Sequence, residues 1–371
     1  MPEIQIPAAI LPADGRFGCG PSRLREAQLQ AFQTEGAKLM GTSHRQAPVK
    51  NLVKQVQEGL FELFHSPDGY EVVLGNGGST AFWDVASHSL AEGRSQALVH
   101  GEFGAKFAAA LRAPWLQTPT VIEGEPGSRL ELDAEAGVSS YVYPQNETST
   151  GVVAPVRRVA GADPGALFFT DATSAAGGID FDPLATDVYY FAPQKNFASD
   201  GGLWFALMSP AAIERAERIA KSDRYIPEFL SLKVAIDNSR LNQTLNTPAV
   251  ATLFLMNEQV KWMNANGGLK WADARTRAAS GHLYDWAEAS SFATPFVANP
   301  EHRSNVVVTI DFDASIDAAS VAKVLRNNGV VDVEPYRKLG RNQLRVATFT
   351  ATELSEVQAL TEAIDYVVAA L

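Results

Sequence analysis

The sequence contains one cysteine, Cys19, among 371 residues. A single cysteine cannot form an internal disulfide, and such chains are typical of a reducing compartment. No apolar run reaches the roughly 20 residues that a helix needs to cross a bilayer. The N-terminal segment also lacks the basic and apolar regions of a signal peptide. We therefore expect a cytoplasmic protein with no membrane partner.

Positive charge is also scarce. The chain has 31 Lys and Arg against 42 Asp and Glu, a formal net charge of −11. Such a balance argues against nucleic acid or an anionic membrane as a partner. An acidic protein that handles an anionic substrate must do so with a few local arginines. No metal site is predicted.

What the chain does have is apolar sequence in short, regularly spaced runs. Apolar residues make up 46% of the sequence, enough for a large core and two domains. The predicted strands of the first part cover residues 72–74, 97–100, 138–143, 166–170, 187–191 and 203–208. Helical patterns alternate with them, at 79–90, 105–111 and 210–221 among others. Two more helices are expected to begin after N-caps, one at 23–39 after Ser22 and one after Thr247, with Pro248 in its first turn. This alternation predicts an α/β fold with a mainly parallel sheet and helices on both faces.

A domain boundary is expected near Gly267 and Gly268, which close a long helical pattern. The remainder reads as helix 270–289, strand 305–312, helix 316–327, strands 330–334 and 343–348, and helix 353–369. We predict a large domain of residues 17–264 and a small α/β domain. The small domain would comprise residues 265–371 together with the N-terminal segment 1–16.

One lysine has an unusual sequence setting. Lys195 follows the apolar strand that ends at Phe191, and Phe197 and Trp204 come soon after it. If these rings wall the lysine, partial desolvation lowers the pKa of its amine and makes it a usable nucleophile. The competing interpretation is an ordinary solvated loop lysine.

Two features upstream support the chemical interpretation. Asp171 ends a predicted buried strand, where it can act as a counter-ion, although capping a turn is the alternative. Further upstream, glycines 75–78 lead from a strand into a helix that begins with Ser79 and Thr80, a suitable phosphate site. The turn matches neither the dinucleotide fingerprint nor the Walker pattern.

Phosphate cradle, strand-end carboxylate and lysine follow one another in the order found in fold-type I enzymes of pyridoxal phosphate (PLP). Over nearly its whole length the chain resembles the phosphoserine aminotransferase family, and within it the actinobacterial branch. The motifs that carry the resemblance are 17–21 (Phe-Gly-Cys-Gly-Pro), 43–45 (Ser-His-Arg), 146–148 (Asn-Glu-Thr), Asp171 with Thr173, 194–196 (Gln-Lys-Asn) and 246–248 (Asn-Thr-Pro). Each is weak alone, but their order along the chain is specific.

The resemblance implies a fold with a large PLP-binding domain, built on a seven-stranded type of sheet, and a smaller C-terminal domain. It assigns Lys195 to the imine with PLP and Asp171 to the protonated ring nitrogen, as the two catalytic residues. The other cofactor contacts that it implies are Ser79, Thr80 and Gln194 at the phosphate, Thr173 in support of the phosphate, Phe103 stacked on the ring and Thr148 at the phenolic oxygen.

In this family the residues that correspond to Asn246 and Thr247 reach the cofactor phosphate of the neighbouring subunit. The resemblance therefore implies a homodimer with shared active sites. It also implies that substrate is bound by four residues, His44, Arg45, Arg337 and Arg345. Tyr336 departs from the family pattern, because many members have histidine before the first small-domain arginine.

The implied reaction is the reversible transfer of an amino group between O-phospho-L-serine and 2-oxoglutarate in serine biosynthesis. 4-Phosphohydroxy-L-threonine, in pyridoxine biosynthesis, is a further possible substrate. Alternatives are a serine or alanine–glyoxylate aminotransferase, a cysteine desulfurase and a PLP-binding protein without turnover. A desulfurase needs a mobile cysteine in the C-terminal half, whereas this chain has only Cys19.

Overall fold

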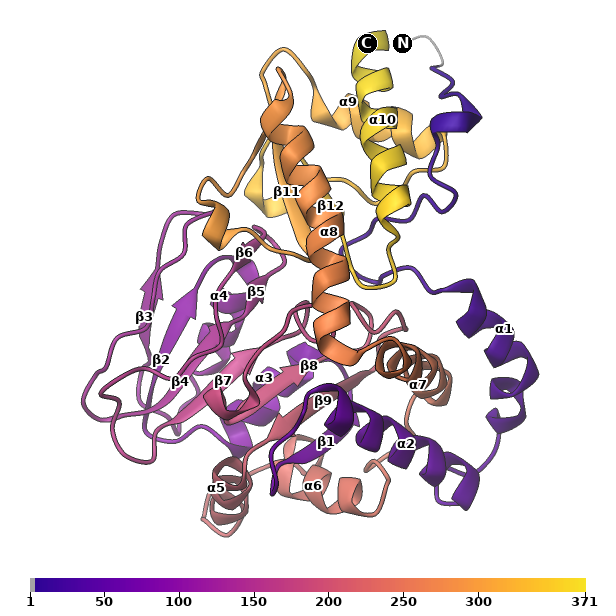
Figure 1. Cartoon of the computed structure of the whole chain (residues 1–371). Helices are drawn as coiled ribbons and strands as arrows, with labels where there is room; N and C mark the ends of the chain where they lie inside the picture. Colours follow the sequence, from indigo (N-terminus) through magenta and orange to yellow (C-terminus); the bar gives the residue numbers. More distant parts are fainter. Residues whose placement is uncertain (1–3) are drawn as a thin grey trace.

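A seven-stranded sheet forms the centre of the larger part of the molecule (Figure 1). The computed structural model describes residues 4–371; residues 1–3, where the expected N-terminal segment begins, lie outside the described residues. The strand order is β1 (Glu71–Asn76), β9 (Leu203–Met208), β8 (Val188–Phe191), β7 (Leu167–Asp171), β4 (Val138–Pro144), β2 (Arg94–Val99) and β3 (Thr120–Glu123). Only β9 runs against its neighbours, so the expected mainly parallel sheet is confirmed.

The two faces of this sheet are covered by different helices because successive side chains of a strand point to opposite faces. On β8, Tyr189 and Phe191 enter a core with α2 (Ala47–Leu63) and α7 (Val250–Ala265). Tyr190, between them, enters the core of the opposite face. The helices of that face are α3 (Ser79–Ser89), α4 (Glu102–Ala110), α5 (Pro210–Ala220) and α6 (Leu232–Arg240).

A second, smaller unit lies above the first in Figure 1 and is reached along α8 (Gly268–Ala289). Its antiparallel sheet consists of β10 (Ala293–Pro295), β11 (Val307–Phe312) and β12 (Gln343–Ala347), and its other helices are α9 (Ala318–Asn327) and α10 (Leu354–Ala370). Ile6 and Phe17 from the N-terminal segment pack into its core. The strand predicted at 330–334 does not form, because Val331 makes only an isolated bridge to Arg16.

The N-terminal helix is shorter than the pattern predicts. We expected one helix from Arg23 to Leu39 capped by Ser22, but α1 covers Glu26–Thr34 and starts after Arg25. Ser22 is held elsewhere, at the loop that carries Lys195. The remaining short elements are β5 (Asn146–Glu147), β6 (Val152–Val153), and the 3-10 helices Ala8–Ile10, Gly36–Leu39, Pro183–Ala185, Glu228–Leu230, Pro300–His302 and Arg337–Leu339.

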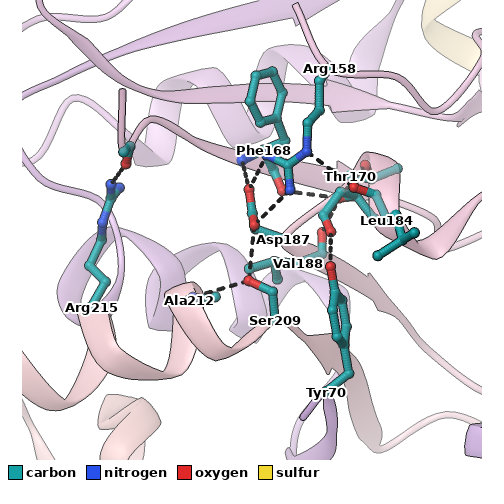
Figure 2. A network of polar contacts seen from close by, with 12 residues as sticks. Tyr70, Arg158, Phe168, Thr170, Leu184, Asp187, Val188, Ser209, Ala212 and Arg215 are labelled. Carbon is teal, nitrogen blue, oxygen red and sulfur yellow. Dashed lines mark hydrogen bonds and ion pairs between the residues drawn. The ribbon is translucent and has the colours of Figure 1, made fainter. Parts of the chain in front are cut away.

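A buried polar network ties the strands together where β7 and β8 begin (Figure 2). Asp187 accepts hydrogen bonds from both terminal nitrogens of Arg158, at 3.0 and 2.9 Å, and from Ser209 Oγ at 2.9 Å. It also accepts one from the backbone N–H of Phe168 at 2.9 Å. Every donor reaches a carboxylate that is almost fully buried. This network stabilises the end of the sheet at which β7 and β8 begin.

Between residues 4 and 371, no helix is long and apolar enough to span a membrane. The same residues contain no group of three or more His, Cys, Asp or Glu side chains arranged to hold a metal ion.

The strands β1, β2, β4, β7 and β8 all end at one edge of the large sheet. Open α/β sheets bind ligands outside the carboxyl ends of their strands. The loops that leave this edge are therefore the place to look for a site.

Candidate active site

A cavity of about 290 Å³ lies at the carboxyl edge of the large sheet. Its lining residues are Gly78, Ser79, Thr80, Trp83, Phe103, Asn146, Thr148, Asp171, Thr173, Gln194 and Lys195. Eight of the ten residues predicted to contact the cofactor are in this set; the other two, Asn246 and Thr247, are not. The loops after five strands thus converge on one enclosed space.

Lys195 projects its amine into this cavity and donates a hydrogen bond to the backbone oxygen of Cys19. The pKa of Lys195 is lowered from 10.5 to about 8, chiefly by burial and also by nearby Arg345, while Cys19 and Asp171 act in the opposite direction. Gly20, where the chain passes the amine, has a φ of +133° that favours glycine, and a side chain there would meet the lysine Nζ. A large fraction of the amine is therefore unprotonated in mildly basic solution.

The loop that carries Lys195 is fixed on both sides. Ser22 Oγ donates to the backbone oxygen of Lys195 at 2.6 Å, and the Ser22 N–H donates to the Gln194 oxygen at 2.9 Å. The buried Asn196 side chain donates to the Ser174 oxygen at 2.9 Å. Ser22 was predicted to cap a helix, but in the structure it anchors this loop. The lysine therefore enters the cavity from a rigid segment.

Asp171 is the last residue of β7 and its side chain is buried. One carboxylate oxygen, Oδ1, accepts from the Thr173 backbone N–H at 2.9 Å and from Thr173 Oγ1 at 2.6 Å. The other, Oδ2, accepts from Tyr190 Oη at 2.7 Å and from Trp83 Nε1 at 3.3 Å. Four donors thus hold the carboxylate in one orientation.

Trp83 and Tyr190 were not singled out as site residues from the sequence. Tyr190 belongs to a strand that reads as continuous core, and Trp83 lies one turn into α3. The only clue in the sequence is that each residue places a polar group, a phenol or an indole N–H, in an apolar stretch. A buried phenol or indole N–H needs a hydrogen-bond partner, but the sequence does not show which one.

The first turn of α3 forms a second wall. Ser79 and Thr80 are its first residues, and the glycine before them, Gly78, is the N-cap. The N–H groups of a first helical turn have no partner within the helix and favour an anion. Ser79 Oγ lies 2.6 Å from Thr173 Oγ1, a contact that joins this wall to Asp171.

Phe103 supplies the aromatic wall at the start of α4. Its position is fixed by Glu147, a fully buried carboxylate that accepts from the backbone N–H groups of Phe103 and Gly104 at 3.4 and 3.0 Å. Burial raises the pKa of Glu147 above its usual value, although these hydrogen bonds oppose the shift. The three walls expected from the sequence lie in the core instead: Phe191 and Phe197 stack on each other on one face of the sheet, and Trp204 packs on the opposite face.

Two oxygens on the cavity wall have no hydrogen-bond partner within the described chain, Asn146 Oδ1 and Gln194 Oε1. Thr148 Oγ1 is engaged differently, since it donates to Ser174 Oγ at 2.8 Å. A buried acceptor without a donor is costly. These oxygens therefore mark positions where a polar ligand completes the site.

A larger cavity of about 840 Å³ lies beside the first. It contains the cations Arg337, Lys338 and Arg345 together with the acids Asp332 and Glu334. Arg345 Nη1 donates to the backbone oxygen of Thr148 at 2.9 Å, which joins the walls of the two cavities. Arg337 has no hydrogen-bond or ion-pair partner among residues 4–371. The predicted small-domain arginines therefore face one space next to Lys195.

The remaining predicted site residues gather elsewhere. His44 Nδ1 lies 3.1 Å from Thr247 Oγ1, and Arg45 bonds the Gln243 side chain and the Leu245 oxygen. Neither His44, Arg45, Asn246 nor Thr247 lines either cavity. The helix start predicted at Thr247 is also displaced, since α7 begins at Val250 after Ala249. Within one chain, these four residues form a separate cluster, in which Arg45, Asn246 and Thr247 are exposed and His44 is half-buried.

The chain is similar to known proteins over most of its length. Residues 20–333 match the family Aminotransferase class-V. The chain is 61% identical over 367 residues to a phosphoserine aminotransferase from a Nocardioides species, and the match covers 98% of each.

Two solved structures share the fold. A phosphoserine aminotransferase from Cytophaga hutchinsonii has a TM-score of 0.87 at 22% identity and covers 95% of this chain and 99% of its own. A PLP-bound phosphoserine aminotransferase from Trichomonas vaginalis has a TM-score of 0.82 at 18% identity, with coverage of 95% and 99%. Because the identities are only 22% and 18%, these two structures show that the fold is shared and nothing more.

Proposed function

Because this chain belongs to the aminotransferase class-V family, we propose that it transfers an amino group between O-phospho-L-serine and 2-oxoglutarate with PLP as cofactor. The fold is that of a fold-type I aminotransferase. The observation that carries the proposal is one cavity in which Lys195, with its lowered pKa, shares the walls with the strand-end carboxylate of Asp171.

The residues present fit PLP. The α3 N-terminus with Ser79 and Thr80 suits its phosphate, and the charged Asp171 suits its ring nitrogen. Phe103 offers an aromatic face, and the unpartnered oxygen of Gln194 points to a polar ligand. When bound, PLP supplies the electron sink for the transamination.

Lys195 has two tasks in this proposal. Its amine, whose pKa is lowered by burial, would hold the cofactor covalently. With substrate bound, Lys195 Nζ would move a proton to and from the substrate α-carbon. Asp171 would hold the proton of the ring nitrogen, because four donors fix its carboxylate in one orientation.

The cations of the larger cavity fit a doubly anionic substrate. The whole protein is acidic, so attraction must come from a local group of cations. Arg345 lies on a strand and is anchored to Thr148, which suits a fixed fork for the α-carboxylate. Arg337 has no partner among residues 4–371 and is available for the phosphate or the second carboxylate.

We also propose a homodimer in which His44, Arg45, Asn246 and Thr247 complete the partner's site. Support comes from their placement: four predicted site residues lie together outside both cavities of their own chain, and three of them are exposed. Large apolar side chains are exposed nearby in sequence, at Tyr225, Phe229 and Leu241. Such side chains are typical of an interface when they gather in one patch.

Two further predictions accompany this proposal. The boundary between the large and small domains is proposed near residue 264, where α7 ends and α8 begins. Residence in the cytoplasm stays a prediction, which cell fractionation with an antibody to the protein tests.

The proposed reaction is tested with purified protein, PLP, phosphoserine and 2-oxoglutarate, by measuring glutamate chromatographically. We expect glutamate to form with phosphoserine and at a far lower rate with serine. A higher rate with alanine or serine and glyoxylate would contradict the proposal in favour of a glyoxylate-type aminotransferase. No turnover with any amino acid would favour a PLP-binding protein.

A further inference from the structure

Asp171 is held by a chain of hydrogen bonds that runs through Tyr190, a residue outside the cavity lining. The Trp83 indole N–H donates to Tyr190 Oη at 2.9 Å, and Tyr190 Oη donates to Asp171 Oδ2 at 2.7 Å. The same indole lies 3.3 Å from Asp171 Oδ2. Tyr190 is completely buried, and the other two residues are 5% and 6% exposed. Solvent therefore has little access to these contacts.

Packing prevents the Tyr190 ring from turning away. The ring stacks on Phe82 with centroids 4.4 Å apart, and Phe107 meets it edge-on at 5.6 Å. Burial, with the neighbouring charge of Asp171, raises the pKa of Tyr190 well above 10. The phenol therefore keeps its proton at every pH at which the enzyme works, and it serves only as a donor to the carboxylate.

We propose that Tyr190, supported by Trp83, is a positioning residue that aims Asp171 into the cavity and weakens its hold on the proton of the ring nitrogen. A hydrogen bond to a charged carboxylate favours the charged form. With Tyr190 in place, the proton stays on the ring nitrogen rather than on Asp171. This inference rests on the proposed function, in which Asp171 pairs with that nitrogen.

Other charged groups lie near Tyr190 and Lys195, and their charges should not change between the variants that are compared. The charged or titratable neighbours are Glu147 and Asp171 for Tyr190, and Cys19, Arg345 and Asp171 for Lys195. Replacing the Tyr190 hydroxyl removes a neutral group, so none of these charges is altered directly.

The test compares Tyr190→Phe with Tyr189→Phe in the PLP-loaded protein. Tyr189 is the adjacent strand residue, equally buried, and its hydroxyl donates to Gln145 Oε1 at 2.8 Å on the opposite face of the sheet. Both variants lose one buried hydroxyl, which makes one hydrogen bond at Tyr189 and two at Tyr190. Only Tyr190→Phe removes a donor from Asp171. Both variants should therefore lose stability, while only Tyr190→Phe should alter the site.

The readout is the pH midpoint at which the visible absorbance of the lysine-bound cofactor changes. Without the Tyr190 donor, Asp171 becomes more basic and takes a larger share of the ring proton. The Lys195 nitrogen then keeps its own proton to higher pH, so the midpoint rises in Tyr190→Phe and stays unchanged in Tyr189→Phe. We also expect kcat/KM for phosphoserine to fall about tenfold in Tyr190→Phe alone.

Equal midpoints and equal kcat/KM in the two variants would overturn the inference. If Tyr190→Phe does not fold, Trp83→Phe, which removes the indole N–H, is measured by the same criteria. Asp171→Asn distinguishes a wrong role for Asp171 from a wrong role for Tyr190. An active Asp171→Asn contradicts the proposed role of Asp171, whereas an inactive Asp171→Asn with an unaffected Tyr190→Phe refutes only the role of Tyr190.

Discussion

Burial of Lys195 makes its amine reactive and also makes the cofactor-free protein sensitive to pH. The pKa is about 8 when folded, against 10.5 for the unperturbed lysine. Between these values the unfolded chain binds more protons than the folded one, so stability rises with pH. Below pH 8 both states are protonated and the full cost of burial remains, at most about 3 kcal/mol.

We therefore expect Lys195→Met to be more stable than the wild type at pH 7 when both lack PLP. The advantage should shrink as the pH rises from 8 to 10, because the wild-type amine loses its proton on the way. Urea unfolding at several pH values measures the difference. An advantage that does not change with pH would mean that the amine is not desolvated as described.

Arg345 is expected to serve both substrates. Its guanidinium is anchored to the Thr148 oxygen and lies over the Tyr336 ring, with 5.4 Å from Cζ to the centroid. Arg345→Ala should lower kcat/KM for phosphoserine and glutamate alike, by about 10- to 150-fold, as expected for a lost hydrogen bond to a charged group. Arg341→Ala is the control, because Arg341 pairs with Asp311 on the same unit outside the cavity. A loss confined to phosphoserine would place the phosphate at Arg345.

At the scale of elements, the two ends of the large sheet have separate tasks. The carboxyl end carries the cavity, and the other end carries the Asp187 network of Figure 2. Asp187→Ala leaves the Phe168 N–H and Ser209 without their buried acceptor. We expect a loss of about 3 kcal/mol in the free energy of unfolding, with kcat of the folded protein unchanged.

Glu71→Ala is the matched control for this prediction. Glu71 pairs with Arg240 at 2.7 Å on the surface, where an ion pair contributes less than about 1 kcal/mol. Urea unfolding gives both stabilities, and activity is assayed below the transition. A large fall in kcat with little change in stability would show that the network acts on the site.

Sequence patterns located most of these elements because each has a buried face. Tyr189, Tyr190 and Phe191 formed a strand as predicted, and the strands that end at Asp171 and before Lys195 became neighbours. The edge strand β3, which is only partly buried, was not predicted, nor was the short helix α6. The antiparallel direction of β9 could not be predicted either, because strand direction depends on pairing between distant segments and leaves no local sequence pattern.

The site was predictable where one residue type has one chemical task. Lys195 and Asp171 stood out because a lysine and an aspartate at strand ends need an explanation. Trp83 and Tyr190 did not, since an aromatic residue in a core pattern is sufficiently explained by packing. The Ser22 cap failed for a similar reason: a serine before a helix has many possible partners, and here the Lys195 loop takes it.

At the scale of the whole molecule, the proposed shared sites make a prediction about mixed dimers. Lys195→Ala and Thr247→Glu should each be inactive alone, the second because its carboxylate repels the cofactor phosphate. A mixed dimer contains one site with Lys195 from one subunit and Thr247 from the other. Equal mixing after dissociation should then restore about one quarter of wild-type activity, as symmetry requires.

The control for the mixed dimer is to combine Lys195→Ala with wild-type protein under the same conditions. No recovery in the first mixture, with normal exchange in the control, would mean that each site is built from one chain. An active monomer in sedimentation experiments would contradict the shared-site proposal directly.

The central claim is that one cavity unites Lys195 and Asp171 around PLP for the transamination of phosphoserine. The absorption spectrum of the purified, PLP-loaded protein tests this most directly. We predict a visible band that phosphoserine converts, that 2-oxoglutarate then restores, and that serine leaves nearly unchanged at equal concentration. In Lys195→Ala, the loss of the band with phosphoserine and its return with 2-oxoglutarate should both be absent. A wild-type protein with no visible band, or with a band that phosphoserine does not change, would contradict the account.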